Sequence, residues 1–237
     1  MATINVVFDF DSTLATTFVG GEMFRGHIPE EMLAVASKRY KAGDTSLREY
    51  QEEVFDLVDE TTAEMSKRAV DTSAIRQFGN EICERVWAAG GKIMVASAGL
   101  DFYIRPVLDS LGLARIELHS GKVVSDPTNR PPFRYDYPSF KNSCKGDWVT
   151  CKCEVINLLK NENEDDDGDI EVIFVGDGST SDSCAATNAA DVVFATGRLL
   201  NYCRKNGIAA TEFGDDLRPV LDYVVSKTSK KRSELEQ

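Results

Sequence analysis

The chain has 237 residues and a formal net charge of −12 at pH 7, with 42% hydrophobic and 28% charged residues. This composition is ordinary for a soluble globular protein, and the length allows one α/β domain or a core that carries a smaller inserted domain. The negative charge argues against broad nucleic-acid or anionic-membrane binding, because the bulk field would repel phosphate groups. The sequence has neither a secretory signal pattern nor an apolar run near the roughly 20 residues that span a bilayer. We therefore expect a cytoplasmic protein that binds neither nucleic acid nor a membrane.

The first predicted strand ends in two carboxylates. Residues 4–8 form an apolar run of strand length, and Asp9, Asp11 and Thr13 follow it. Residues i and i+2 of a strand point the same way, so Asp9 and Asp11 are expected to aim at one point beyond the carboxyl end of the strand. Crowded carboxylates repel each other and lose hydration, a cost that a hard cation such as Mg²⁺ relieves. The pattern predicts a metal-assisted site, although Asp and Ser are also common at the start of solvated turns.

Residues 15–71 are predicted to form a small helical cap inserted after the first strand. Pro29 opens a helix with apolar residues at helical spacing, and a break follows near residue 43. Ser46 and Glu49 then predict a capping box for a second helix. The remaining residues, 1–14 and 72–237, are expected to form a discontinuous core.

Strands and helices alternate through this core. In chain order we first expect a helix at 73–89, a strand at 92–96 and a helix at 101–111. An excursion near 115–150 follows, with a hairpin at 116–124 and a Pro-rich loop or edge segment at 127–138. After it we expect a helix from Lys152, an acidic surface loop at 162–169, strands at 171–175 and 191–195, helices near 198–206 and 215–226, and a polar tail. Short apolar strands separated by helices imply an α/β fold with three layers, a Rossmann-like parallel sheet covered by helices on both faces. In such sheets active sites gather at the carboxyl ends of strands, where Asp9, Asp11, Ser97 and Asp177 fall.

Six cysteines occur in the chain: Cys83, Cys144, Cys151, Cys153, Cys184 and Cys203. Without a secretory signal they are expected to be reduced thiols. Cys144, Cys151 and Cys153 are neighbours in the sequence, with His119 as a candidate further ligand, but no paired C-x-x-C elements occur. Free cysteines are therefore the favoured interpretation over a structural zinc site.

Four segments in order resemble the motifs of the haloacid dehalogenase (HAD) superfamily. The first is D-x-D-x-T at Asp9, Asp11 and Thr13, the second is the hydroxyl of Ser97 at the end of an apolar strand, the third is a lysine, and the fourth is an acidic pair after a strand, Asp177 and Asp182. Lys152, at a predicted helix start, fits the lysine position best, and Lys145 is the alternative. A helical cap between the first two motifs is typical of the phosphoserine phosphatase-like subgroup. Within it, residues 143–153 and 191–208 look closest to the methionine-salvage 2-hydroxy-3-keto-5-methylthiopentenyl-1-phosphate phosphatases.

The resemblance implies a Mg²⁺-dependent phosphomonoesterase that acts on a small phosphorylated metabolite, and it is compatible with a homodimer. In this interpretation Asp9 is the nucleophile that forms an aspartyl-phosphate, and Asp11 is the general acid and then the general base. Mg²⁺ is held by Asp9, the backbone carbonyl of Asp11 and Asp177. The phosphate contacts are assigned to Thr13, Ser97, Ala98 and Lys152, with Asp182 orienting the lysine or a metal-bound water.

Three alternatives remain open. One is a catalytically silent phosphate-binding or regulatory protein on the same fold. Another is a phosphoserine phosphatase proper, but those enzymes carry an acidic residue shortly after the first motif, and here no acid occurs before Glu22. The third is a serine hydrolase that uses Ser97 with His27 or His119, although Ser97 lacks the G-x-S-x-G context of such a nucleophile.

Overall fold

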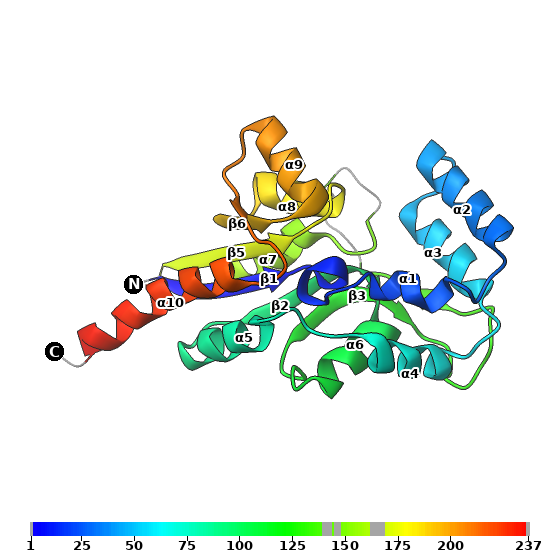
Figure 1. The fold of residues 1–237 in the computed structure, drawn as a ribbon, viewed down its shortest axis with the longest axis horizontal. Coiled ribbons are helices and arrows are strands. Elements are labelled where there is room, and N and C mark those ends of the chain that lie inside the picture. The colour runs from blue at the N-terminus through cyan, green and yellow to red at the C-terminus, as the bar shows by residue number, and fades with distance from the viewer. Residues whose placement is uncertain (1, 139–143, 145–147, 162–168, 236–237) are drawn as a thin grey trace.

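A seven-stranded sheet forms the centre of the computed structural model, which describes residues 2–138, 144, 148–161 and 169–235 (Figure 1). The strand order is β4-β3-β2-β1-β5-β6-β7. The strands are β1 (Thr3–Phe8), β2 (Ile93–Leu100), β3 (Glu117–Val123), β4 (Tyr135–Asp136), β5 (Ile170–Gly176), β6 (Val192–Ala195) and β7 (Thr211–Glu212). Neighbouring strands run parallel except for β3 and β4, which pair antiparallel. The predicted α/β fold with a Rossmann-like parallel sheet is confirmed.

The central strands are apolar on both faces because each face is covered by helices. Alternate side chains of a strand point to opposite faces, and in β1 Val6 and Phe8 pack into one core while Val7 packs into the other. Helices α5 (Gly79–Ala88), α6 (Asp101–Ser110) and α10 (Arg218–Leu235) contribute to the first core. Helices α7 (Lys152–Asn161), α8 (Ser181–Asn188) and α9 (Gly197–Asn206) contribute to the second. The sheet is thus the middle layer of three.

After a short π-helical turn at Phe10–Leu14, four α-helices lie between the first strand and α5: α1 (Val19–Phe24), α2 (Glu30–Ala42), α3 (Leu47–Asp56) and α4 (Thr62–Thr72). Figure 1 shows α2 and α3 projecting beyond the end of the sheet, whereas α4 lies beside α6. The predicted capping box forms at Ser46 and Glu49, where each side chain binds the backbone N–H of the other residue. The two ends of this insertion lie side by side, since Ala15 and Ile75 form an antiparallel bridge.

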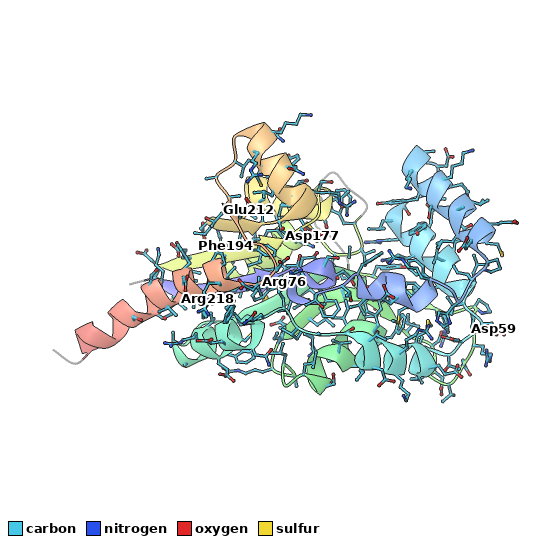
Figure 2. All side chains as sticks on the ribbon, viewed as in Figure 1. Asp59, Arg76, Asp177, Phe194, Glu212 and Arg218 are labelled. Atoms are coloured by element: carbon cyan, nitrogen blue, oxygen red, sulfur yellow. The ribbon has the colours of Figure 1, made fainter. Side chains whose placement is uncertain are left out.

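The predicted helix at 73–89 is wrong in its first part. Helix α5 begins only at Gly79, because Phe78 adopts a φ of 73°, a left-handed conformation that a continuous helix does not permit. The preceding residues instead run beside the first motif. The Arg76 guanidinium donates to the backbone oxygens of Ser12 (2.7 Å) and Thr13 (2.8 Å) (Arg76 is labelled in Figure 2). This segment therefore supports the loop after β1.

Two further predictions are wrong, and a third lies partly outside the described residues. No hairpin forms at 116–124, because this stretch is the single strand β3, parallel to β2. Gly121 is not a turn residue but a point of close packing, since a Cβ there would meet side chains of Leu100, Tyr137 and Val149 within 2.9 Å.

The predicted polar tail is largely helical, because α10 continues to Leu235. The acidic run at 162–169 has only Asp169 within the described part of the chain. In the same part, every helix is too short or too polar to cross a bilayer.

Candidate active site

The predicted motifs meet at the carboxyl edge of the sheet. Phe8 of β1 pairs with Val95 of β2 and with Val175 of β5. Asp9 follows Phe8 directly, and Asp177 lies two residues after Val175 (Figure 2). Parallel register therefore brings residues far apart in the sequence to one place.

A buried lysine lies between two carboxylates at this edge. The Nζ atom of Lys152, at the first position of α7, lies 2.7 Å from Oδ1 of Asp9 and 2.5 Å from Oδ1 of Asp182. Lys152 and Asp182 are each 2% exposed, and Asp9 is 8% exposed. Asp182 also accepts hydrogen bonds from the backbone N–H groups of Asp177 (3.2 Å) and Gly178 (2.8 Å). Lys152 thus lies between Asp182 and Asp9; the supporting role of Asp182 stays a prediction. The alternative lysine, Lys145, lies outside the described residues.

Burial and neighbouring charges shift the pKa values of Asp9, Lys152 and Asp177. Burial raises the pKa of the Asp9 carboxyl well above its usual range, while the Lys152 ammonium acts in the opposite direction. Burial by itself lowers the pKa of Lys152, but the carboxylates of Asp182 and Asp9 raise it above its ordinary value. Burial and the charge of Asp182 also raise the pKa of Asp177. Three carboxyl groups therefore share one ammonium group in a poorly hydrated site.

The same carboxylates are placed to hold a divalent cation. Carboxylate oxygens of Asp9, Asp177 and Asp182 lie within 4.8 Å of one another. Thr13 Oγ1 donates to Oδ1 of Asp177 at 3.3 Å, which orients that side chain. Carboxylate oxygens are the ligands that Mg²⁺ prefers, and the excess negative charge favours a cation. This donor set fits Mg²⁺, and it brings the carboxylate of Asp182 close to those of the two predicted ligands Asp9 and Asp177.

The Asp11 carboxylate points away from this group and toward α1. Its Oδ1 accepts from the backbone N–H of Gly20 (3.0 Å), and its Oδ2 accepts from the Tyr103 hydroxyl (3.0 Å). Burial raises the pKa of Asp11 to about 6, and the two hydrogen bonds partly oppose that rise. Ser12, the next residue, has a φ of 60°, which turns the chain sharply after the strand. Asp9 and Asp11 therefore have different environments although they are two residues apart.

Ser97 lies inside β2 rather than at its end, at the point where pairing with β3 shifts register. Its Oγ accepts from the backbone N–H of Gly99 at 3.0 Å. Both histidines have carboxylate partners of their own: His27 lies 3.0 Å from Glu60, and His119 lies 2.9 Å from Glu117. This geometry gives no support to a serine hydrolase.

A cavity of about 440 Å³ opens over these residues. Its floor includes Asp9, Asp11, Ser97, Ala98 and Lys152. Its other walls include the aromatic side chains of Phe18, Phe24, Tyr40, Tyr50, Phe55 and Tyr103 from the inserted helices and α6, together with the cations Lys41 and Arg198. Gln51 of α3 reaches across and donates to the backbone oxygen of Ala98 at 2.6 Å. The inserted helices thus enclose the site from above.

The sequence-based prediction missed two residues that organise the site, Tyr103 and Arg76. Tyr103 has the spacing of an ordinary core aromatic on a helix, and Arg76 lies in a stretch expected to be helical. Two glycines, Gly20 and Gly99, pack against Tyr103, and a Cβ at either position would collide with its phenol ring. These glycines are the feature of the sequence that could have pointed to Tyr103.

The profile of the haloacid dehalogenase-like hydrolase family matches residues 6–187. The chain belongs to this family. The match begins within β1 and ends within α8, so it spans all four predicted motifs.

Curated relatives are phosphatases by name. The 2-hydroxy-3-keto-5-methylthiopentenyl-1-phosphate phosphatase of Bacillus pumilus (strain SAFR-032) is 24% identical over 174 residues, which cover 69% of this chain and 70% of that protein. The enzyme of the same name from Bacillus cereus (strain ATCC 10987 / NRS 248) is 24% identical over 217 residues, which cover 89% of this chain and 91% of that protein. Together with the family, these relatives confirm the predicted enzyme class, a phosphoric monoester hydrolase.

Solved structures show the same fold. A substrate-bound phosphoserine phosphatase complex superimposes with a TM-score of 0.66 at 18% identity, covering 94% of this chain and 98% of the other. A HAD family hydrolase from Salmonella enterica subsp. enterica serovar Typhi gives a TM-score of 0.67 at 14% identity, covering 94% of this chain and 72% of the other.

Proposed function

We propose that this protein is a Mg²⁺-dependent phosphomonoesterase that hydrolyses a small phosphorylated metabolite through an aspartyl-phosphate on Asp9. The observation that carries the proposal is the buried contact of Asp9 with Lys152, 2.7 Å from carboxylate oxygen to ammonium, at the floor of an open cavity. A carboxylate held at the base of a pocket beside a fixed cation is suited to attack a phosphate group that the same cation helps to neutralise.

In the first step a carboxylate oxygen of Asp9 attacks phosphorus, and the bond from phosphorus to the ester oxygen breaks. Asp11 donates its proton to the departing oxygen, so the product leaves as an alcohol. Its raised pKa, about 6, gives Asp11 a larger protonated fraction near neutral pH than an ordinary carboxyl has, and this step needs the protonated form. Lys152, Ser97 and the backbone N–H after Ser97 bind phosphate oxygens and stabilise the charge that develops on them.

In the second step water attacks the phosphorus of the aspartyl-phosphate. Asp11, now ionised, takes a proton from this water, the bond from phosphorus to Asp9 breaks, and the carboxylate of Asp9 is regenerated. Its hydrogen bonds to Gly20 and Tyr103 hold the Asp11 carboxylate in one place for both proton transfers.

Asp9, Asp177 and the backbone carbonyl of Asp11 are the groups that we assign to Mg²⁺, with Asp182 as a further carboxylate close to them. When bound there, Mg²⁺ would supply positive charge that offsets the negative charge of the phosphoryl group. Thr13 orients Asp177 through its hydroxyl.

We assign residues 15–71 to a cap that selects the substrate. The side chains that they supply to the cavity are for the most part aromatic or aliphatic, with Lys41 as a cation and Ser37 and Gln51 as neutral polar groups. Among the residues placed around the cavity, the acids are Asp9, Asp11, Asp177 and Asp182, all at its floor. Glu22, the first acid after the motif, instead pairs with Arg25 at 3.3 Å near the surface. A substrate with a neutral or anionic organic part therefore fits better than phosphoserine, whose ammonium group needs a carboxylate partner.

The test is release of phosphate from p-nitrophenyl phosphate in Mg²⁺ and in EDTA, for the wild type and for Asp9→Asn. We expect release in Mg²⁺, loss of release in EDTA, and no turnover by the variant. A panel of phosphorylated metabolites follows, beginning with the substrate named for the curated relatives. A folded wild type that binds phosphate but hydrolyses none of these esters would instead support the silent phosphate-binding alternative. The cytoplasmic location and the homodimer stay predictions.

A further inference from the structure

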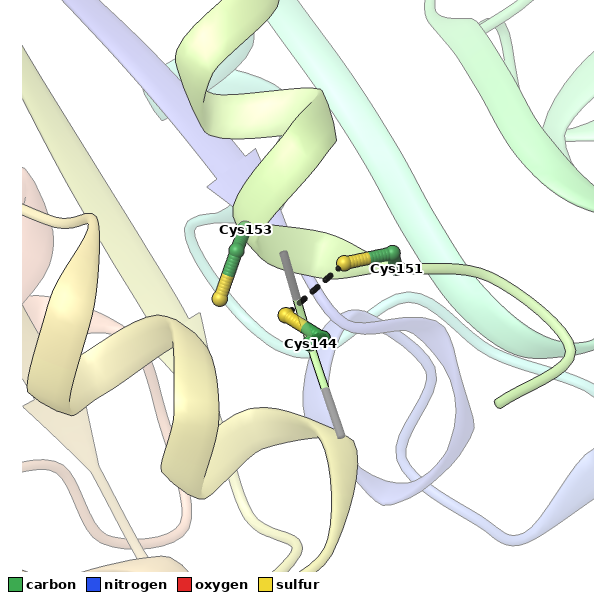
Figure 3. A group of neighbouring side chains, drawn as sticks. All are labelled: Cys144, Cys151 and Cys153. Carbon is green, nitrogen blue, oxygen red and sulfur yellow. Dashed lines mark hydrogen bonds between the residues drawn. The ribbon is translucent and has the colours of Figure 1, made fainter. Parts of the chain in front are cut away.

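Four cysteine sulfurs lie in one cluster beside the candidate active site. The Sγ atom of Cys144 lies 3.1 Å from that of Cys151 and 3.2 Å from that of Cys184, and Cys184 lies 3.2 Å from Cys153. The sulfurs of Cys144, Cys151 and Cys153 all lie within 4.8 Å of one another (Figure 3). Cys184 comes from α8, 31 residues after Cys153, so the sequence pattern gave no reason to include it.

We propose that Cys144, Cys151, Cys153 and Cys184 bind one Zn²⁺ ion. Zinc in structural sites is tetrahedral with a Zn–S distance of about 2.3 Å, which separates neighbouring sulfurs by about 3.8 Å. Three of the sulfur pairs, at 3.1, 3.2 and 3.2 Å, are about 0.6 Å closer than this and would spread slightly around an ion. Cys184 is not among the sulfurs that all lie within 4.8 Å of one another, so its side chain would also move toward Cys151 on binding. Four soft sulfur ligands favour zinc over Mg²⁺.

The surroundings suit a structural ion. Cys151 and Cys153 are buried, and Cys144 and Cys184 are half-buried, so the site is enclosed yet has an exposed side through which an ion enters. The cluster joins Cys144, the start of α7 and the first half of α8. A bound ion would add a link between these parts of the chain to the apolar packing of α7 against α8.

The site also adjoins the ion pair of the active site. Cys151 and Cys153 flank Lys152, and Cys184 lies two residues after Asp182. An ion at the four sulfurs therefore fixes the two helix ends whose side chains meet at 2.5 Å. Its role is to position Lys152 and Asp182; it does not touch the reacting groups.

The test is the metal content of the protein purified with zinc and a reductant. We expect one zinc per chain after dialysis against EDTA, measured by inductively coupled plasma mass spectrometry. A mercurial that reacts with thiols should release this zinc to a colorimetric indicator. Co²⁺ added to the reduced, zinc-free protein should give visible absorption of a tetrahedral ion and near-ultraviolet sulfur-to-cobalt charge transfer, signals that a carboxylate site does not produce.

The variant Cys184→Ser should lower zinc affinity at least tenfold and lower the Tm of the zinc-loaded protein. Its matched control is Cys83→Ser, because Cys83 is also buried but packs in the core on the opposite face of the sheet; it should keep one zinc. If Cys184→Ser does not fold, the zinc content and the Co²⁺ spectrum of the wild type still test whether the four cysteines bind a metal ion.

Three results would overturn the proposal. The first is a folded wild type without zinc and without thiolate absorption on adding Co²⁺. The second is iron or copper bound in place of zinc. The third is a disulfide between two of the four cluster cysteines, detected as fewer than six free thiols in the denatured, unreduced protein and located by peptide mapping. None of these measurements depends on the phosphatase reaction, so they stand apart from the test of the proposed function.

Discussion

Replacing Lys152 by Met removes the only ammonium group that contacts Asp9 and Asp182 among the described ion pairs, and it keeps an unbranched side chain of similar volume. The two carboxylates then remain buried without a cation. Breaking a buried pair in this way destabilises proteins by about 3–5 kcal/mol, because an uncompensated charge is left in a poorly hydrated site. Asp182 keeps its hydrogen bonds from the backbone of Asp177 and Gly178. We therefore expect a loss near the lower limit, about 3 kcal/mol in the free energy of unfolding.

The assay is urea unfolding in EDTA, followed by tryptophan fluorescence and far-ultraviolet circular dichroism. Lys160→Met is the matched control, since Lys160 pairs with Asp191 at 2.6 Å and both side chains are about one third exposed, at 31% and 37%. Exposed pairs of this kind contribute about 0.2–1 kcal/mol. The double variant Asp9→Asn/Lys152→Met should recover part of the stability that Lys152→Met loses, because it removes one of the unpaired charges. If Lys152→Met costs no more than Lys160→Met, the buried ion pair does not have the energetic role argued here.

Three further predictions concern the residues around Asp11 and the metal site. Tyr103→Phe removes one hydrogen bond to the Asp11 carboxylate, so kcat should fall about tenfold, which corresponds to about 1.4 kcal/mol; steady-state kinetics that match the wild type would contradict this. Gly99→Ala should destabilise the protein by about 1–3 kcal/mol, because the added Cβ collides with the phenol of Tyr103. Urea unfolding measures this loss against Gly214→Ala, where the Cβ meets open space, and equal stability of the two variants would refute the packing argument. Mg²⁺ should raise the Tm of the wild type, with about 2.7 kcal/mol of stabilisation at a concentration of 100 Kd; Asp177→Asn should abolish the rise in differential scanning fluorimetry, and an unchanged rise would exclude Asp177 as a ligand.

The sheet and the position of the acidic motifs were accessible from the sequence because both follow from local patterns. Strand β1 reads as a continuous apolar run since both of its faces are covered. Parallel pairing then aligns the ends of β1, β2 and β5, which brings Asp9 and Asp177 together without any knowledge of the tertiary packing.

Other features depend on contacts that a single sequence does not encode locally. The hairpin expected at 116–124 does not form, because Gly121 allows close approach of Leu100 and Val149 within a strand. Tyr103 has the spacing of a core residue on α6, and its hydroxyl nevertheless reaches Asp11, 92 positions away in the chain. Cys184 joins the other cysteines only because α8 packs beside α7.

The most direct test of the central claim is to trap the covalent intermediate. The wild type turning over p-nitrophenyl phosphate in Mg²⁺ is quenched rapidly in acid, digested and mapped by mass spectrometry, with Asp9→Asn as the control. The account predicts one added phosphoryl group on Asp9, lost on treatment with hydroxylamine and absent from the variant. Phosphoryl transfer to another residue, or rapid turnover by Asp9→Asn, would contradict it.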